Sequence, residues 1–224
     1  MSHPADPPRL PGEAGAARLR HPTNTEAITM ARISLEPRRT VLYRLSEWYS
    51  RRTYGDVLDP LRAIGHNRRV MMADARFEMA VGKWKALDPQ LKLLAQMAAS
   101  HVIGCSWCTD FGYWLAHRAG MPEQKLHAVP GWRDDRGQFT DLELDVLEYA
   151  EEMCRTSPQI DDDLADRLLR QLGEAAFVEL TAIVAVENLR SRMNSALGLT
   201  GQGFKDRCEL RPRSGAGTAV ASGA

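Results

Sequence analysis

Residues 88–120, DPQLKLLAQMAASHVIGCSWCTDFGYWLAHRAG, contain the pattern that decides the fold. Asp88 is a good helix N-cap, and Pro89 suits the first helical position because its missing N–H costs nothing there. Gly104 interrupts the helix that follows. Apolar residues recur at helical spacing between these limits and predict a buried face: Leu91, Leu94, Met97, Ala98 and Val102.

A two-cysteine corner, Cys105-Ser106-Trp107-Cys108, follows directly, and a second helix ends at Gly120. The apolar face of this helix consists of Phe111, Trp114 and Leu115. Two thiols separated by two residues on the first turn of a helix can close into a disulfide. The free N–H groups and the positive dipole at that helix end favour a thiolate. The corner therefore predicts redox chemistry.

Zinc binding and inert structural cysteines are the alternatives for this pair. A zinc site needs four ligands at compact spacing, usually a second Cys pair or a Cys/His set. Cys154 and Cys208 are far from each other and from any such His, and His117 lies nine residues past Cys108. We therefore favour a redox pair with no metal, and we expect Cys154 to be a small buried side chain.

Two neighbouring polar residues are candidates for catalysis beside Cys105 and Cys108. His101 lies four residues before Cys105, where a continued helix would place it on the same face, positioned to favour a thiolate or to relay a proton. It is equally typical of a helix end or a subunit contact. Asp110 can transfer protons, although acidic residues near a helix N-terminus often only stabilise it. We expect Trp107, Phe111 and Ser100 to line the substrate pocket, with aromatic core packing the alternative for Trp107.

The remaining pattern is helical, with no segment typical of a strand. Helices are predicted from Arg38, from Pro60 to Gly65, over 68–84, 122–129 and 140–155, from Ile160 to Gly173 and over 174–197. We expect an all-α fold in one domain over 33–205, with a disordered extension at 1–32 and a flexible tail at 206–224. Predicted buried stripes are Val70, Ala73, Phe77, Ala80, Val81 and Trp84 in one helix, and Phe177, Leu180, Ile183, Val184, Leu189 and Met193 in the last.

Composition excludes several function classes. The formal net charge is +0, which gives no reason to expect nucleic acid or an anionic membrane as partner. No apolar run approaches the length needed to span a bilayer, and the N-terminus lacks the apolar core of a secretory signal, so we expect a cytoplasmic protein. No nucleotide, haem or flavin motif is present, and the expected redox group is the Cys105–Cys108 disulfide itself.

Two further features have open interpretations. Eight Arg residues lie within 38–70, around a helix with Val41, Leu42, Leu45, Trp48 and Tyr49 on one face. They form an anion-binding or partner surface, or a solvated or subunit-contact face. Polar residues also interrupt the last apolar helix: Glu187, Asn188, Arg190, Arg192 and Asn194. They either bond across an interface or hold a loop near the cysteines, or the helix emerges into solvent.

The helix–G-C-x-x-C–helix unit and the segment AVENLRSRMNSALGL at 185–199 resemble the carboxymuconolactone decarboxylase/alkylhydroperoxidase D-like family. The resemblance covers about residues 35–205 and is most specific over 92–116. It implies an all-helical homotrimer or homohexamer. It also implies a Cys pair that reduces peroxides and is recharged by a dithiol electron-donor protein, with Cys108 attacking and Cys105 resolving.

The proton relay of that family does not carry over. Its Glu, twelve positions before the first cysteine of the pair, corresponds to Leu93, and its His, four positions after the second cysteine, corresponds to Gly112. A further His sometimes found before the second cysteine corresponds to Trp107. Lactone decarboxylation is not expected, because those members use acid–base groups rather than a Cys pair.

The sequence thus predicts a thiol oxidoreductase that reduces hydroperoxides or disulfides through a sulfenic or mixed-disulfide intermediate. The first alternative is a non-catalytic redox sensor whose disulfide controls assembly or a partner. The second is a structural zinc site in a binding protein.

Overall fold

A computed structural model describes residues 31–209, and every regular element in this range is helical. The elements are α1 (Val41–Tyr54), α2 (Asp59–Ile64), α3 (Arg68–Val81), α4 (Pro89–Ile103), α5 (Ser106–Arg118), α6 (Glu123–Ala128), the short 3₁₀ turns η1 (Val129–Gly131) and η2 (Arg136–Gln138), α7 (Asp141–Glu152), α8 (Asp162–Ala196) and α9 (Asp206–Glu209). The predicted all-α fold is confirmed.

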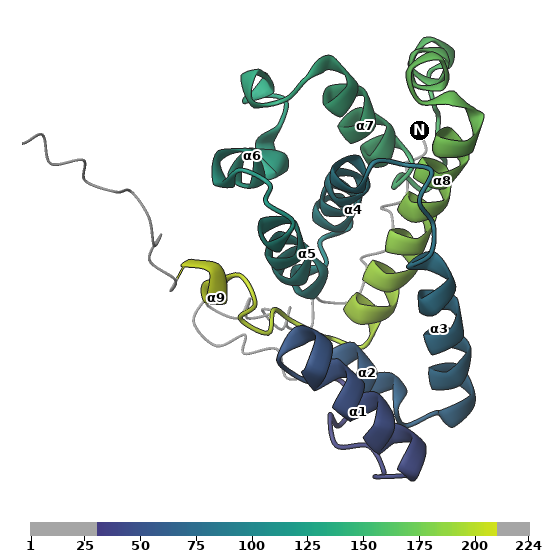
Figure 1. Cartoon of the computed structure of the whole chain (residues 1–224), viewed down its shortest axis with the longest axis vertical. Coiled ribbons are helices and arrows are strands. Elements are labelled where there is room, and N and C mark those ends of the chain that lie inside the picture. Colours follow the sequence, from purple (N-terminus) through teal and green to yellow (C-terminus); the bar gives the residue numbers. More distant parts are fainter. Residues whose placement is uncertain (1–30, 210–224) are drawn as a thin grey trace, which may run out of the picture.

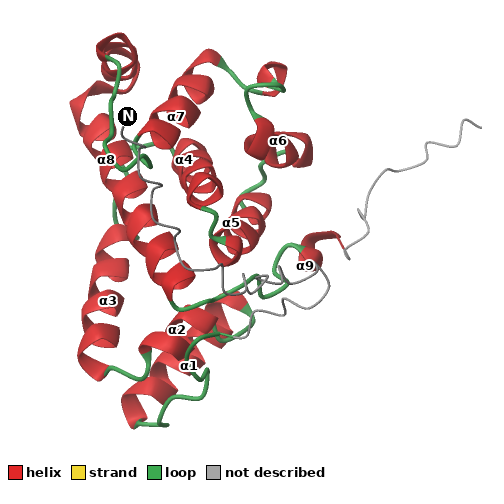
Figure 2. Cartoon of the chain, turned by 180° about the vertical axis from the view of Figure 1, so that it is seen from behind, coloured by secondary structure: helices red, strands yellow, loops and turns green. Residues whose placement is uncertain are grey.

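Helix α4 is the centre of the molecule. It packs against α5, α7 and α8, and its Leu94, Ala95 and Ala99 are fully buried. Figure 1 shows α4 between α5, α7 and α8, while α1, α2 and α3 lie together at one end of the molecule. Figure 2, from the opposite side, shows the same separation. The end of α8 and the start of α5 meet the α1–α3 group, and the cysteine corner lies at this junction.

The helix boundaries follow local capping signals. The Asp88 carboxylate accepts N–H bonds from Gln90 and Leu91, and α4 ends at Gly104, which has a left-handed φ of 78°. Thr140 and Glu143 form the reciprocal capping box at the start of α7. Gly173 (φ 76°, ψ 165°) breaks α8 into the two helices that the sequence predicts.

Two apolar helix faces identified from the sequence are largely exposed in the single chain. In α1 the apolar set is exposed except for the half-buried Leu42, with Val41 at 86% and Trp48 at 62%, and Tyr43 and Ser50 are buried instead. In α3, which ends at Val81 rather than Trp84, Val70, Ala73, Phe77 and Ala80 of the predicted stripe are exposed, whereas Val81 is buried in the core and Trp84 packs against it. The buried side of α3 is formed by Met71 and Val81, so only the C-terminal part of the predicted stripe is buried.

Smaller departures occur at helix ends. Val102 of α4 and Leu189 of α8 are exposed, although both were expected in buried stripes. The buried face of α8 continues instead through polar residues: Glu187, Ser191 and Asn194.

The packed structure extends slightly past both predicted domain limits. The Arg32 guanidinium donates to the Ser195 and Ala196 carbonyls at the end of α8, 2.9 and 2.7 Å away. Cys208, in α9, is buried in the main core. The rest of the predicted extension and tail, residues 1–30 and 210–224, lies outside the described residues. Between residues 31 and 209, no helix is both long and apolar enough to cross a membrane.

Candidate active site

The cysteine corner forms because α4 stops at Gly104 and α5 starts two residues later. Cys105 is the N-cap of α5, and its sulfur accepts the backbone N–H of Cys108 at 3.2 Å. The two cysteines are joined by a disulfide, with their Cα atoms 5.3 Å apart. The Cys105 sulfur therefore lies at the positive end of a helix, where a thiolate is stabilised once the bond is reduced.

The two sulfurs have different surroundings. Cys105 is 1% exposed and packs in a small apolar cluster. Cys108 lies on the wall of a cavity of about 320 Å³, which Cys105 does not line. The Asn194 side-chain amide of α8 donates to the Cys108 sulfur at 3.3 Å. Only Cys108 of the pair is thus presented to a small molecule in the cavity.

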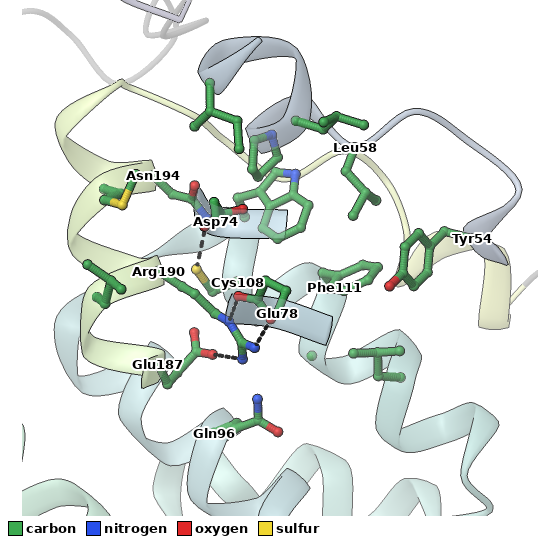
Figure 3. Close-up of a pocket in the computed structure, with 18 of the residues that line it drawn as sticks. Tyr54, Leu58, Asp74, Glu78, Gln96, Cys108, Phe111, Glu187, Arg190 and Asn194 are labelled. Atoms are coloured by element: carbon green, nitrogen blue, oxygen red, sulfur yellow. Dashed lines mark hydrogen bonds and ion pairs between the residues drawn. The ribbon is translucent and has the colours of Figure 1, made fainter. Parts of the chain in front are cut away.

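The cavity has an apolar part and a polar part (Figure 3). Aromatic side chains of α1 and α5 (Tyr54, Trp107 and Phe111) and aliphatic side chains, among them Leu58, Leu61, Leu93 and Leu115, make up most of the lining. The polar part consists of Asp74 and Glu78 from α3, Gln96 from α4, and Glu187, Arg190 and Asn194 from α8. An apolar cavity with a few convergent polar groups is typical of small-molecule sites.

Ion pairs connect α3 with α8 in the polar part. Arg190 donates through Nε and Nη2 to the two Glu78 oxygens, at 2.8 and 2.5 Å, and through Nη1 to Glu187 at 3.4 Å. Burial raises the pKa of the Glu187 carboxyl, although Arg190 and a hydrogen bond from Ser191 act in the opposite direction. Burial and the nearby Glu78 charge likewise raise the pKa of Asp74.

The two predicted relay residues do not meet in the cavity. His101 is exposed and lines a separate hollow beside Trp132 and Arg133. The left-handed Gly104 ends α4 before Cys105, so the helical register that would align His101 with the thiol is lost. The Asp110 carboxylate accepts backbone N–H groups of Gln202, Phe204 and Lys205, at 2.7, 3.0 and 2.7 Å. It anchors the chain after α8 against α5.

Two of the three predicted pocket residues line the cavity, and the third does not. Trp107 and Phe111 line the cavity and stack with their ring centroids 4.9 Å apart. The Trp107 indole N–H also donates to Gln202 at 3.2 Å. Ser100 is buried and bonds to the Met97 carbonyl, so it supports the end of α4 and is not part of the cavity wall.

Leu93 and Gly112, which occupy the family's relay positions, both line this cavity. The positions correspond, but neither side chain can move a proton. Asp74, Glu78 and the cavity role of Glu187 are not predicted by the sequence pattern. The available signal was the 187, 191, 194 spacing, which places all three polar side chains on one face of α8.

The other polar residues of α8 have separate roles. The Asn188 amide donates to the Cys154 sulfur at 3.3 Å, and Arg192 is exposed. Cys154 is a buried free thiol, and Cys208 is buried as well. In the described range, 31–209, no group of three or more His, Cys, Asp or Glu side chains is arranged to hold a metal ion.

Comparison with known proteins shows the family of this chain. Residues 69–152 match the carboxymuconolactone decarboxylase family. The uncharacterized protein YnjA of Escherichia coli K12 is 36% identical over 169 residues, which cover 73% of this chain and 90% of YnjA. The chain belongs to the carboxymuconolactone decarboxylase family.

Solved structures show the same fold at low sequence identity. A peroxidase-related protein from Ralstonia eutropha JMP134, described as an alkylhydroperoxidase AhpD core, has a TM-score of 0.69 at 16% identity, covering 78% of this chain and 94% of that one. The debrominase Bmp8 in complex with 2,3,4-tribromopyrrole has a TM-score of 0.68 at 18% identity, covering 79% and 96%.

Proposed function

We propose that this protein is a thiol peroxidase that reduces small organic hydroperoxides. The observation that supports it best is the asymmetry of the disulfide, in which Cys108 faces an apolar cavity and Cys105 is enclosed at the N-terminus of α5. Cys108 is then the attacking thiol and Cys105 the resolving one. The AhpD-like fold of its structural neighbours supports the same chemistry.

In the first step the reduced Cys108 attacks the outer oxygen of the hydroperoxide as a thiolate. An S–O bond forms and the O–O bond breaks. The electron pair leaves with the alkoxide, which takes up a proton and departs as an alcohol. Cys108 is left as a sulfenic acid.

The Cys105 thiol then attacks the Cys108 sulfur. The S–S bond forms, the S–O bond breaks, and the hydroxide leaves as water with the Cys105 proton. Two thiols have been oxidised to one disulfide, and the peroxide has been reduced to an alcohol and water. An external dithiol, proposed here to belong to an electron-donor protein, reverses the oxidation by attacking Cys108. Cys105 is the better leaving group because the helix end and the Cys108 N–H stabilise its thiolate.

The cavity indicates the class of substrate. Its volume of about 320 Å³ lies at the lower end of the range for small-molecule sites. Its aromatic and aliphatic walls bury an apolar alkyl or aryl group, which hydrogen peroxide lacks. Alkyl and aryl hydroperoxides should therefore react faster than hydrogen peroxide.

Stopped-flow oxidation of the reduced protein tests this proposal. Cumene hydroperoxide should convert the thiols to the Cys105–Cys108 disulfide faster than hydrogen peroxide does, and dithiothreitol should sustain repeated turnover. The Cys108→Ser variant should be inactive, and the Cys154→Ala control should match the wild type. A single oxidation without turnover would instead support the redox-sensor alternative.

Reductive debromination of a small aromatic compound is a second candidate, favoured by the aromatic walls and the similarity to Bmp8. Cys108 would attack the bromine, the carbon would take up a proton, and Cys105 would displace bromide as the disulfide forms. Bromide release from 2,3,4-tribromopyrrole, dependent on Cys108, distinguishes this reaction from peroxide reduction.

We also propose a homotrimer or homohexamer. The exposed apolar side chains of α1 (Val41, Leu45, Trp48 and Tyr49) form a face that a second copy of the chain would cover. Sedimentation analysis of the wild type and of Trp48→Glu tests this, since the charge should shift the equilibrium toward monomer. A cytoplasmic location, where thiols are kept reduced, is part of the same proposal.

A further inference from the structure

The family's proton donors are replaced here by Leu93 and Gly112, yet the proposed reaction releases an alkoxide that needs a proton. The remaining ionisable groups of the cavity wall are Asp74, Glu78, Glu187 and Arg190, together with Tyr54. A replacement donor must be sought among these groups, because a proton from a positioned side chain speeds such a step by about 10²–10⁴-fold.

Glu187 differs from the other two carboxylates in its surroundings. It is 5% exposed, and it lies on the buried face of α8 that leads through Ser191 to Asn194, the residue bonded to the Cys108 sulfur. The Ser191 hydroxyl donates to Glu187 at 3.0 Å and fixes the carboxyl group. Figure 3 shows Glu187 and Arg190 on α8, the helix that also carries Asn194 with its hydrogen bond to Cys108.

The charge of Glu187 is only partly compensated. One guanidinium, Arg190, serves both Glu78 and Glu187. Glu78 receives the two shorter contacts, at 2.8 and 2.5 Å, and Glu187 a single one at 3.4 Å. A buried carboxylate with so weak a partner favours its neutral form, and burial accordingly raises the pKa of Glu187.

We propose that Glu187 is the catalytic acid of this site and protonates the oxygen that leaves when Cys108 attacks a hydroperoxide. The proposal rests on the peroxidase function proposed above. It assigns to α8 the proton transfer that the family motif places on α4 and α5.

The proton balance closes over one cycle. The neutral Glu187 gives its proton to the alkoxide, which departs as alcohol, and becomes a carboxylate. The carboxylate takes up the proton that the Cys108 thiol releases before the next attack. Glu187 ends each cycle as it began, and the electrons still come from the two thiols.

The proposal implies a bell-shaped dependence of the oxidation rate on pH. The rate rises as Cys108 ionises and falls as Glu187 loses its proton. The titratable or charged groups near Glu187 are Asp74 and Glu78 on α3, Arg190 on its own helix, Cys108 on α5 and Cys154 just after α7. The substitution of Glu187 itself therefore provides the decisive comparison.

The test compares wild type with Glu187→Gln in single-turnover oxidation by tert-butyl hydroperoxide and by peracetic acid. The first releases an alkoxide, a strong base that needs a proton. The second releases acetate, which does not. We expect Glu187→Gln to be about 100-fold slower with tert-butyl hydroperoxide, to lose the alkaline limb, and to be much less affected with peracetic acid.

Glu179→Gln is the matched control, because Glu179 is a buried carboxylate of α8 that pairs with Lys92 outside the cavity. It should keep the wild-type rate and pH profile. Equal losses with both oxidants, or an unchanged rate with tert-butyl hydroperoxide, would overturn the role of Glu187. A wild type that reacts with neither oxidant would instead refute the peroxidase function.

If Glu187→Gln does not fold, Glu187→Asp replaces it. This variant keeps the acid but withdraws it by one methylene, so it should be slower with tert-butyl hydroperoxide while retaining the alkaline limb. A wild-type rate in Glu187→Asp, or the loss of its alkaline limb, would contradict the proposal.

Discussion

Two asparagine side chains of α8 each donate an amide hydrogen bond to a cysteine sulfur, at the same distance. Asn194 contacts Cys108 and Asn188 contacts Cys154, both at 3.3 Å. Cys108 lies in the first turn of α5, has a partner cysteine and opens to the cavity. Cys154 is a buried free thiol whose pKa is raised by burial. The hydrogen bond alone therefore does not distinguish the two sulfurs; the helix N-terminus, the partner cysteine and the cavity do.

The largest expected difference is between the two thiols themselves. In the reduced wild type at pH 7.5, iodoacetamide should modify Cys108 at least about 100-fold faster than Cys154, because the thiolate is the nucleophile, Cys108 lines the cavity, and burial raises the pKa of Cys154. Peptide mass spectrometry over a time course gives both rates. Comparable rates would remove the distinction between the two environments.

Removal of the two amides should have unequal consequences. Asn194→Leu keeps the side-chain size but deletes a hydrogen bond to a thiolate, and such bonds contribute about 1.5–3 kcal/mol. The midpoint of the pH dependence of the rate at which iodoacetamide modifies Cys108 should rise by about 1–2 pH units. Asn188→Leu is the control on the same helix and should leave that midpoint unchanged. The same shift in both variants would indicate a general disturbance of α8.

Substitution of Asp110 distinguishes a structural role of its carboxylate from a catalytic one. Asp110→Ala leaves three backbone N–H groups of the 202–205 segment without their acceptor, which should lower the free energy of unfolding by about 2–4 kcal/mol. The oxidation rate of the folded variant should change less than about twofold. Asp166→Ala, at an exposed position of α8, should change neither quantity. Loss of rate without loss of stability would restore Asp110 as a proton donor.

The smallest effect is expected at His101. Its ring is exposed and lines a hollow that does not contain Cys108. His101→Ala should keep the wild-type oxidation rate and pH profile, with stability changed by about 0.5 kcal/mol or less. A slower oxidation or an altered pH profile in this variant would show that His101 acts on the thiols.

The sequence predicted those features that depend on neighbours in the chain. Asp88, Gly104, the Cys105–Cys108 spacing and the Thr140 capping box act within a few residues, and all four have the expected structure. His101 was misplaced although it is close in sequence, because the left-handed Gly104 turns the chain before Cys105.

The cavity could not be predicted in the same way. Arg190 and Glu78 are 112 residues apart, and they meet only because α3 lies beside α8, which the periodicity of neither helix reveals. The apolar stripe of α1 shows the same limit, since the pattern identifies a face without stating what covers it. Long-range packing, rather than local propensity, brings the polar groups of α8 to Cys108.

Trapping of the sulfenic acid tests the central claim most directly. Reduced Cys105→Ser and Cys108→Ser variants would each be treated with cumene hydroperoxide and dimedone, and the adduct located by peptide mass spectrometry. Our account predicts a dimedone adduct on Cys108 in Cys105→Ser and none on Cys105 in Cys108→Ser. An adduct on Cys105, or none in either variant, would contradict the assignment of Cys108 as the thiol that meets the peroxide in the cavity.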